Sequence, residues 1–559
     1  MKSKTGRLFL ILIVSAFIFN CGGGGGGGGV DVDEEGATPP PAPTGLTATA
    51  VSASRIDLSW HASANAVGYN VYRNDNKLAI ANVFNTTSYS DYNLTPRTPY
   101  TYTVRAYNSN GNESDPSNQA GATTLGTATI LSGTTSNDYG RGVAVDGSGN
   151  IFVTGWTGGN LDGNTNIGHA EVFLTKYDSK GIKQWTKLLG TTGVSGPNPD
   201  ALLDALGNGL NVAVDGSYVY VTGYTTGGID GAGAIGGKDI FLVRYDKSNG
   251  SGKLSKIMGT ASDDAGNSVA VDTSGNVYVT GYTEGEIGGA GSHKGGKDVI
   301  LIKCNSSLVP QWARQIGSTG DDVATAVAVS ASGNKVAITG QAGGPFVSFS
   351  NEPGWGFSGG VSDLFVARYD SAGNNGSLVF RGSDDVNKAT KTTAGLSIAI
   401  YQDSYVAVTG ITNGEFGASN QGGYDIVVAY LNLSNFTDSN GRWNKQIGTA
   451  LDDIAYGITM DSDPGNVYVT GFTWGTLPPF FVNKGEEDIL LARFGLSGTL
   501  FSVTLAGTAG DEKGKAIAFD ANNDYLYIAG FTNASLDGIT NFGAYDMCLL
   551  KFDLSGVQQ

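Results

Sequence analysis

The sequence predicts an all-β protein in which a small β-sandwich is followed by a ring of seven four-stranded sheets. Three observations support this prediction. Glycine accounts for 86 of the 559 residues, which suits many tight turns and disfavours helices, where each glycine costs roughly 1 kcal/mol. Short segments alternate apolar and polar residues, as half-buried strands do. One unit, typified by "NSVAVDTSGNVYVTGYTEGE" from Asn267 to Glu286, recurs along most of the chain.

The charge balance and the scarcity of histidine limit the possible functions. The chain carries 34 Lys and Arg against 51 Asp and Glu, a net charge of −17 at pH 7. Because such a protein repels phosphate backbones, we expect no nucleic-acid partner. The only histidines are His61, His169 and His293, so imidazole metal clusters and His-dependent catalytic triads are poorly supplied.

The first twenty residues predict an export signal. A basic heptapeptide precedes the apolar run from Leu8 to Phe19, which is too short to span a bilayer and has the length of a signal-peptide core. The run ends at "IFNC", which resembles a bacterial lipobox, although Asn20 stands where a small residue is usual. The resemblance implies a signal peptide over 1–20 and a membrane anchor of several acyl chains on Cys21. The alternative is an ordinary signal peptide, or an uncleaved anchor, with an incidental cysteine.

Residues 21–38 predict a tether. Gly22 to Gly29 is an unbroken octaglycine, which behaves as a flexible coil. The acids and prolines after it keep the chain solvated and extended. A tether beside a lipid holds a folded body away from a membrane. We therefore expect a lipid-anchored protein of the bacterial envelope, in the outer membrane, facing either the cell surface or the periplasm.

Residues 39–124 predict the β-sandwich. The segments "RIDLSW", "GYNVYR" and "TPYTYTVRAYNSNG" alternate apolar and polar positions. The whole segment resembles a fibronectin type III domain, with a Leu-x-Pro-x-Thr-x-Tyr pattern at Leu94, Pro96, Thr98 and Tyr100. The resemblance implies that Trp60 is buried and that Tyr100 forms a tyrosine corner. We expect a spacer; a ligand-binding module is the alternative.

The repeated unit spans residues 127–559, and its most regular mark is a glycine that ends an apolar strand. This glycine recurs at intervals of 58–70 residues, a period typical of repeat architectures. The seven copies are Gly155, Gly223, Gly281, Gly340, Gly410, Gly471 and Gly530.

Each unit predicts four strands, here named a to d in chain order. Strands b and c are apolar at successive positions, so both faces of each small sheet need to be buried between similar sheets. An open solenoid would also satisfy this pattern. The last unit lacks strand d, however, and a d-like strand, "ATILSGTTSND", precedes the first unit. A seven-bladed β-propeller closed by this N-terminal strand follows, because closure hides both sheet edges.

Two sequence marks, "VAVDxSGNVYVTGYT" and "GGxDxFLxRYD", resemble the bacterial seven-bladed β-propeller repeat (SBBP) family. That resemblance implies the propeller fold and an exported bacterial protein but no single activity. Cys304 and Cys548 fall in strands c, where we expect buried side chains; a reactive or metal-binding role is the alternative.

Acidic residues recur at one face of the predicted propeller, where the d-to-a and b-to-c loops emerge together. One set begins the strands c: Glu171, Asp239, Asp298, Asp363, Asp425, Asp488 and Asp546. Another set lies in pairs in the d-to-a loops: Asp263 and Asp264, Asp321 and Asp322, Asp384 and Asp385, Asp452 and Asp453, Asp511 and Glu512. Asp263, Asp264, Asp321, Asp322, Asp452 and Asp453 are the candidate ligands of a cation such as Ca²⁺. The alternative, which their regular recurrence favours, is that they bind backbone N–H groups.

Two long loops break the sevenfold symmetry and supply aromatic side chains. They are candidates for stacking sugars or anchoring a protein partner, with local packing as the alternative. The candidate ligand-binding residues are Phe346, Phe349, Trp355, Phe357, Trp474, Phe480 and Phe481.

No catalytic motif is found in the sequence, which contains neither a Gly-x-Ser-x-Gly elbow nor a His-Glu-x-x-His or phosphate-loop pattern. The function expected is therefore non-catalytic: a lipoprotein that presents the propeller to protein or glycan ligands, without a cofactor other than the Ca²⁺ considered above. The alternatives are a periplasm-facing scaffold for envelope assembly and a hydrolase or lyase whose site lies in the propeller mouth. Such an enzyme should carry a few polar residues there that break the sevenfold symmetry.

Overall fold

The computed structural model describes residues 38–559 with gaps. The gaps are 51–54, 75, 85, 92–93, 95–97, 125–128, 167–169, 191–209, 231, 288, 290–291, 347–356, 434–435, 437–442, 463–464 and 478–482, and only the backbone is described for 76–84 and 375. The described chain forms two compact units, a smaller N-terminal one and a larger C-terminal one. Both are built from strands, and no α-helix occurs in the described residues.

The smaller unit is a sandwich of two antiparallel sheets. One sheet has the order β1-β2-β5 and the other β4-β3-β6-β7. The strands are β1 (Thr44–Ala50), β2 (Ile56–His61), β3 (Gly68–Arg73), β4 (Asn76–Phe84), β5 (Ser88–Asp91), β6 (Pro99–Tyr107) and β7 (Ala120–Thr123).

The core of the sandwich contains the tryptophan expected there. Trp60 is buried and meets the ring of Tyr69 edge to face, with centroids 5.4 Å apart. Tyr100 is half-buried beneath the guanidinium of Arg73. The fully buried tyrosine of β6 is Tyr102, whose hydroxyl donates a 2.8 Å hydrogen bond to Asp91. Thus Tyr102 supplies the buried hydroxyl–carboxylate contact that links the two sheets.

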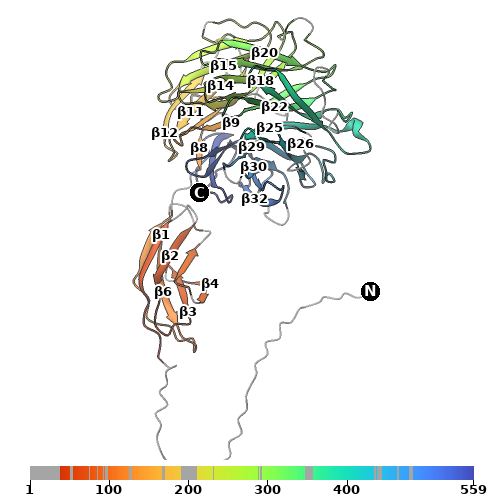
Figure 1. Ribbon diagram of the computed structural model, residues 1–559. Helices are drawn as coiled ribbons and strands as arrows, with labels where there is room; N and C mark the ends of the chain where they lie inside the picture. Colours follow the sequence, from red (N-terminus) through yellow and green to blue (C-terminus); the bar gives the residue numbers. More distant parts are fainter. Residues whose placement is uncertain are drawn as a thin grey trace, which may run out of the picture. The chain divides into compact units, whose positions relative to one another are not determined.

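The larger unit is a β-propeller of seven four-stranded sheets within the described residues, arranged around a ring (Figure 1). Blades 1 to 3 comprise β9 (Asp138–Val145), β10 (Ile151–Thr157), β11 (Glu171–Tyr177), β12 (Lys183–Leu189); β13 (Asn211–Val214), β14 (Tyr218–Thr225), β15 (Asp239–Asp246), β16 (Leu254–Met258); and β17 (Asp264–Val271), β18 (Val277–Thr283), β19 (Asp298–Cys304), β20 (Pro310–Ile316).

Blades 4 to 6 follow the same order. They comprise β21 (Val323–Val329), β22 (Lys335–Ala342), β23 (Asp363–Asp370), β24 (Asn375–Arg381); β25 (Thr393–Tyr401), β26 (Tyr405–Thr412), β27 (Asp425–Asn432), β28 (Trp443–Ile447); and β29 (Asp453–Met460), β30 (Val467–Thr473), β31 (Asp488–Phe494), β32 (Leu500–Ala506). A short 3-10 helix, Lys388–Thr390, precedes β25.

The ring closes as the sequence predicts. Blade 7 consists of β33 (Glu512–Asp520), β34 (Tyr525–Thr532), β35 (Asp546–Asp553) and the N-terminal strand β8 (Ile130–Ser132). β8 pairs with β35 in antiparallel register, with Leu131 opposite Cys548. The innermost strand of each blade also contacts that of the next, and β33 contacts β9. Closure therefore joins the two ends of the propeller, and β8 completes blade 7 as its outermost strand.

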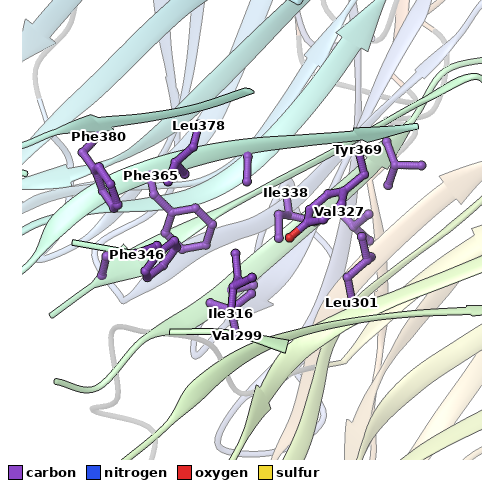
Figure 2. Close-up of a cluster of buried hydrophobic side chains, with 14 of the residues drawn as sticks. Val299, Leu301, Ile316, Val327, Ile338, Phe346, Phe365, Tyr369, Leu378 and Phe380 are labelled. Carbon is purple, nitrogen blue, oxygen red and sulfur yellow. The ribbon is translucent and has the colours of Figure 1, made fainter. Parts of the chain in front are cut away.

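The hydrophobic core is made between blades rather than within one blade. Figure 2 shows the cluster shared by blades 3 and 4, in which Val299 and Ile316 of blade 3 face Phe365 and Phe380 of blade 4. Each blade repeats such a cluster with the next, as expected for sheets that are apolar on both faces. Cys304 and Cys548 are both buried in these clusters, as predicted.

Candidate functional site

The innermost strand of six blades contains a β-bulge at one repeated position. In blade 1, Gly142 pairs with Thr154 but Gly140 pairs with Gly155, so that Arg141 is left over as the extra residue. Blades 3 to 7 show the same shift in register opposite the same glycine. A bulge re-aims the side chain of its extra residue.

The glycine of strand b is the structural partner of this bulge. A Cβ atom on Gly155 would lie 1.8 Å from the carbonyl oxygen of Tyr139, and one on Gly281 would lie 1.9 Å from that of Ala265. The other bulged blades give distances of 1.8–2.0 Å. Any side chain there would overlap the backbone of the bulge. The glycine that recurs most regularly in the sequence therefore lies opposite the point where strand a bulges.

The residue at the bulge differs from blade to blade, whereas its surroundings repeat. The bulged residues are Arg141, Asn267, Thr325, Leu396, Tyr456 and Lys515. Five of these six, all but Asn267, line one cavity of about 180 Å³ enclosed by the innermost strands. Blades of similar backbone structure therefore place chemically different side chains on this cavity.

Two of the polar residues at the bulges are committed to holding neighbouring blades together. The Thr325 hydroxyl donates to the carbonyl oxygen of Gly395 in the next blade at 2.7 Å. The Asn267 amide donates to the carbonyl oxygen of Ala324 at 2.8 Å. Both side chains thus have a role in the ring itself.

Arg141 and Lys515 have no such partner. Among the described residues neither forms an ion pair, and the buried Nε of Arg141 has no hydrogen-bond partner. The Lys515 ammonium lies 3.3 Å from the centroid of the Tyr456 ring, a cation–π contact. Burial, together with the positive charges of Arg141 and Lys513, holds the pKa of Lys515 well below its usual value. Both cations remain partly accessible from the cavity.

Lys513, two residues before Lys515 on β33, differs from Lys515 because it forms an ion pair. Its ammonium lies 2.7 Å from the Glu487 carboxylate. The contrast is informative because both lysines lie on one strand, yet only the one facing the cavity lacks a carboxylate.

The expected clustering of d-to-a and b-to-c loops on one face is confirmed by hydrogen bonds between them. The N–H of Asp322 donates to the carbonyl oxygen of Lys297 at 2.8 Å, and the N–H of Asp453 donates to that of Tyr424 at 2.7 Å. The bulged residue follows three positions after the acid in these blades, so the bulges lie near this face.

The acids of this face are mostly buried between blades rather than displayed. Asp264 accepts the N–H and the hydroxyl of Thr260, while Asp239 of the preceding blade accepts the N–H of Ile235 at 2.8 Å. Both carboxylates are fully buried, and each has one oxygen without a hydrogen-bond partner among the described residues. Gly259 lies between them, where a Cβ atom would be 2.7 Å from Asp239 and 2.8 Å from Asp264.

The remaining candidate ligands of a cation also hold the loops. Asp322 and Asp453 are buried like Asp264 and accept the N–H groups of Ser318 and Thr449. Burial, assisted by a carboxylate of the preceding blade, raises the pKa of each to about 6. The first acid of each pair is more exposed and accepts a backbone N–H of the preceding b-to-c loop. These acids are Asp263, Asp321 and Asp452.

Most of these carboxylates are therefore buried at the blade junctions and do not form a ring on the surface. In the described part of the chain, no group of three or more His, Cys, Asp or Glu side chains is arranged to hold a metal ion. The hydrogen bonds above give the acids the alternative role, fixing the loops at each blade junction.

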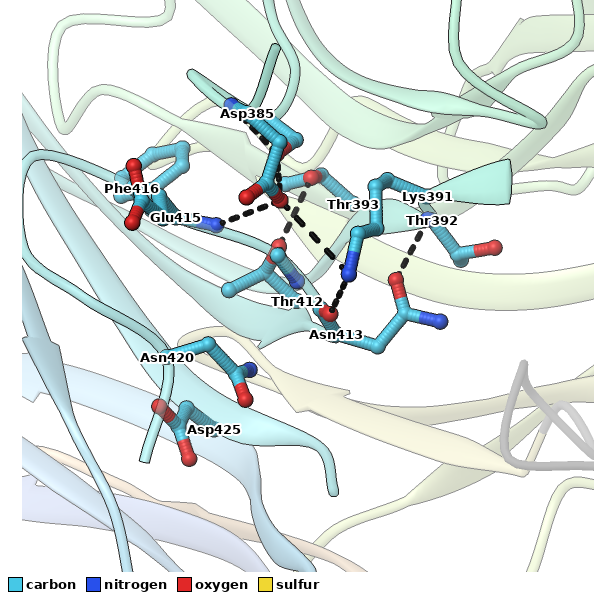
Figure 3. Close-up of polar contacts among 12 residues, drawn as sticks. Asp385, Lys391, Thr392, Thr393, Thr412, Asn413, Glu415, Phe416, Asn420 and Asp425 are labelled. Carbon is cyan, nitrogen blue, oxygen red and sulfur yellow. Dashed lines mark hydrogen bonds and ion pairs between the residues drawn. The ribbon is translucent and has the colours of Figure 1, made fainter. Parts of the chain in front are cut away.

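Blade 5 departs from the pattern. The sequence predicted that Asp384 and Asp385 correspond to the acid pairs of the other blades, and this prediction is wrong. The position of the buried acid is taken by Thr393, whose hydroxyl lies 3.0 Å from that of Thr412 (Figure 3). Asp385 instead accepts the N–H of Glu415 and lies 3.7 Å from the Lys391 ammonium. Asp384 pairs with Arg381 at 2.6 Å.

The aromatic candidates are only partly described. Phe346 is buried against Phe365 and Phe380, with ring centroids 5.2 Å apart in both pairs (Figure 2), so its assignment as a ligand-binding residue is wrong. Phe357 is half-buried on the same cluster, which matches the alternative of local packing. Trp474 is exposed, at 41 % of its surface. Phe349, Trp355, Phe480 and Phe481 lie outside the described residues, as does Cys21.

Sequence reasoning missed the residues that line the cavity enclosed by the innermost strands, which is the central channel of the propeller. A signal was present: one variable position follows the sequence "DYG", "DAG" or "EKG" in units that otherwise repeat closely. Its meaning depends on the bulge, which periodicity does not reveal.

Comparison with known families agrees with this architecture. Residues 41–123 match the fibronectin type III domain, and residues 128–162, 255–288 and 442–478 match the SBBP beta-propeller repeat. The chain is thus an all-β protein that combines a fibronectin type III domain with a β-propeller. More particularly, three segments of its propeller are similar to the SBBP beta-propeller repeat.

Curated relatives match only a limited part of the chain. A poly(3-hydroxybutyrate) depolymerase from Ralstonia pickettii is 38 % identical over 110 residues, 19 % of this chain and 22 % of the relative. Exoglucanase B from Cellulomonas fimi is 35 % identical over 113 residues, 20 % of this chain and 10 % of the relative. The chain spans about a quarter or less of the length of the curated relatives that it matches.

Among solved structures, an auxiliary nutrient binding protein from Bacteroides thetaiotaomicron aligns over 92 % of this chain and 99 % of its own, with 9 % identity and a TM-score of 0.33. A Fn3-like protein from Clostridium thermocellum is 34 % identical over 15 % of this chain and 92 % of its own, with a TM-score of 0.14. Similarity at this level carries no argument about what the present protein binds.

Proposed function

We propose that this protein is a non-catalytic binding lipoprotein of the bacterial envelope whose propeller receives a ligand at the mouth of its central channel. One observation carries the proposal. The blades repeat their scaffold residues closely, yet the bulged position that faces the channel changes in every bulged blade, from Arg141 to Tyr456 to Lys515. Dissimilar side chains on a rigid repeated scaffold are typical of a binding site.

The envelope location rests on the N-terminal sequence. The lipobox-like "IFNC" implies acyl chains on Cys21, and the octaglycine after it implies a tether. No helix among the described residues is long and apolar enough to cross a membrane. Lipid attachment would then provide the anchor, the fibronectin type III domain a spacer, and the propeller the contact with a protein or glycan.

The first test is whether the full chain binds envelope or host glycans and proteins on an array, with Trp474→Ala and Arg141→Gln as variants. Loss of binding in Arg141→Gln alone supports the channel mouth as the site, and loss in Trp474→Ala alone moves the site to the loops. Retention of every array ligand by both variants contradicts either location. Metabolic labelling with a radiolabelled fatty acid tests the anchor. The label should be incorporated into the natural protein and not into Cys21→Ser.

A second candidate function is a lyase acting on a uronic acid, favoured by the lowered pKa of Lys515 beside Arg141. Lysine with a lowered pKa can serve as a general base. In such a β-elimination Lys515 would act in its deprotonated form, unlike in the oxyanion site described below: its amine takes the C5 proton, the C4–O bond breaks, a C4=C5 double bond forms, and the leaving oxygen takes a proton from solvent. Incubation with polygalacturonate and detection of the unsaturated product by ultraviolet absorbance test it. Lys515→Arg, which keeps the charge but cannot act as a base, must abolish any such activity.

A further inference from the structure

We infer that Arg141, Lys515 and Tyr456 form a binding site for the oxyanion of a small ligand, a carboxylate or a phosphate. This inference rests on the proposed function, because it specifies the ligand chemistry of the channel mouth. The three residues come from β9, β33 and β29, which are consecutive around the ring, with β33 in contact with both of the others. The polar groups that are not committed to the scaffold therefore gather on one side of the channel.

The charge of the site points to an anion. Two cations line a cavity whose described lining contains no acidic side chain. Removing a charge from water is costly unless a counter-charge or hydrogen bonds compensate for it. Glu487 forms an ion pair with Lys513, whereas Lys515 forms none among the described residues and feels the Glu487 charge only from a distance. A bound oxyanion would supply the missing counter-charge to both cavity cations.

The geometry of the donors suits an oxyanion in particular. The guanidinium of arginine presents parallel N–H donors that match the two oxygens of a carboxylate or phosphate. The buried and unpartnered Nε–H of Arg141 is one such donor. Burial raises the pKa of Tyr456 to about 12, so its hydroxyl keeps its proton at neutral pH and can donate a further hydrogen bond.

The size of the cavity limits what can enter. Its volume of about 180 Å³ is below the ~300–1,000 Å³ of pockets that enclose a drug-sized ligand. The site would therefore take a single small group, such as one acidic sugar or the charged end of a longer molecule. The valines and isoleucines that border the cavity belong to the apolar clusters between blades, so the surface left for a ligand is mainly polar.

The test is calorimetric titration of the full chain with four probes: galacturonate, its neutral counterpart galactose, acetate and inorganic phosphate. We expect galacturonate to bind and galactose to bind at least about tenfold more weakly, the factor typical of one lost charge-assisted hydrogen bond. Acetate and phosphate distinguish a carboxylate from a phosphate as the preferred group. Affinity should fall as salt concentration rises.

Matched variants locate the site. Arg141→Gln and Lys515→Gln should each weaken binding by about tenfold or more. Lys256→Gln, which removes the same charge from the exposed side chain of Lys256 on β16, should leave it unchanged. Arg141→Lys keeps the charge without the planar fork and should bind between the natural protein and Arg141→Gln. Circular dichroism on each variant establishes that it is folded.

Equal affinity for galactose and galacturonate, no binding of any oxyanion, or unchanged binding in both channel variants would overturn the inference. The binding role can survive that result with its site moved to the loops, since array ligands bound there would still be captured by the natural protein and by both channel variants. If the array also shows no ligand, both proposals fail together.

Discussion

The carbonyl oxygen of Tyr139 lies 1.8 Å from the point that a Cβ atom would occupy on Gly155. The same approach recurs in every blade with a bulge, at 1.8–2.0 Å. Glycine is therefore required on strand b so that strand a can bulge, and the bulge places one residue in each of five blades on the cavity. The constancy of the glycine and the variability of the bulged residue have a single structural cause.

Replacing such a glycine should destabilise the propeller. In Gly281→Ala the new methyl group would overlap the carbonyl oxygen of Ala265, and we expect a loss of about 1–3 kcal/mol in the free energy of unfolding, as for other overpacked cores. Urea denaturation followed by fluorescence measures it. Gly147→Ala is the control, because no atom lies within 4 Å of its Cβ position. Equal stability of the two variants would refute the role given to the bulge.

Closure of the ring by β8 predicts a dependence of the whole propeller on its N-terminal strand. Leu131 is buried in the cluster of blade 7, and Leu131→Ala should cost about 2–5 kcal/mol. Val557→Ala, at an exposed position near the other end of the chain, should change stability by less than about 0.5 kcal/mol. Thermal unfolding of both variants decides the matter. A Leu131→Ala protein as stable as the control would mean that β8 does not close the ring.

The buried carboxyl groups predict a loss of stability as pH rises. The pKa of Asp453 is raised to about 6, mainly by burial and also by Asp425, so between its usual pKa of 3.8 and about 6 the folded protein binds more protons than the unfolded chain. The contribution of this group to stability therefore falls as pH rises from about 4 to 6, and is then constant.

Asp453→Asn tests that pH dependence. The amide keeps an acceptor for the N–H of Thr449 but cannot ionise. Unfolding free energies measured between pH 4 and pH 7 should fall less steeply in the variant than in the natural protein. Parallel curves would show that Asp453 does not titrate in this range.

The two cysteines of the propeller should be inert in the folded protein. Burial raises the pKa of Cys304 to about 12 and raises that of Cys548 as well, so neither forms a thiolate near neutral pH. Iodoacetamide should leave both unmodified in buffer and modify both in urea, as read by peptide mass spectrometry. Modification of either residue in buffer, at a rate like that in urea, would contradict its burial.

Lys515 should reduce stability while serving binding. Its lowered pKa means that the folded state disfavours the charged form, so Lys515→Met should raise the free energy of unfolding by roughly 1 kcal/mol while weakening oxyanion binding. Lys513→Met should lower stability, since it leaves Glu487 without its partner. Urea denaturation at pH 7 compares the two, and a Lys515→Met protein less stable than the natural one would assign that lysine to the scaffold.

The sequence by itself determined the blades, their number and the closing strand. A period near sixty residues, strands apolar on both faces and a displaced "ATILSGTTSND" leave few arrangements other than a closed ring, because each sheet must bury two faces and its edges. The buried cysteines and Trp60 follow from the same alternation of residues.

Only the tertiary structure decided the meaning of the acids, the aromatic residues and the glycine. A carboxylate such as Asp264 has the same sequence signature whether it faces solvent or a blade junction, and Phe346 has the same signature whether its loop folds outward or onto the core. The site was hidden for a similar reason. Arg141, Tyr456 and Lys515 lie far apart in the chain, and only the bulges and the closure of the ring bring them to one cavity.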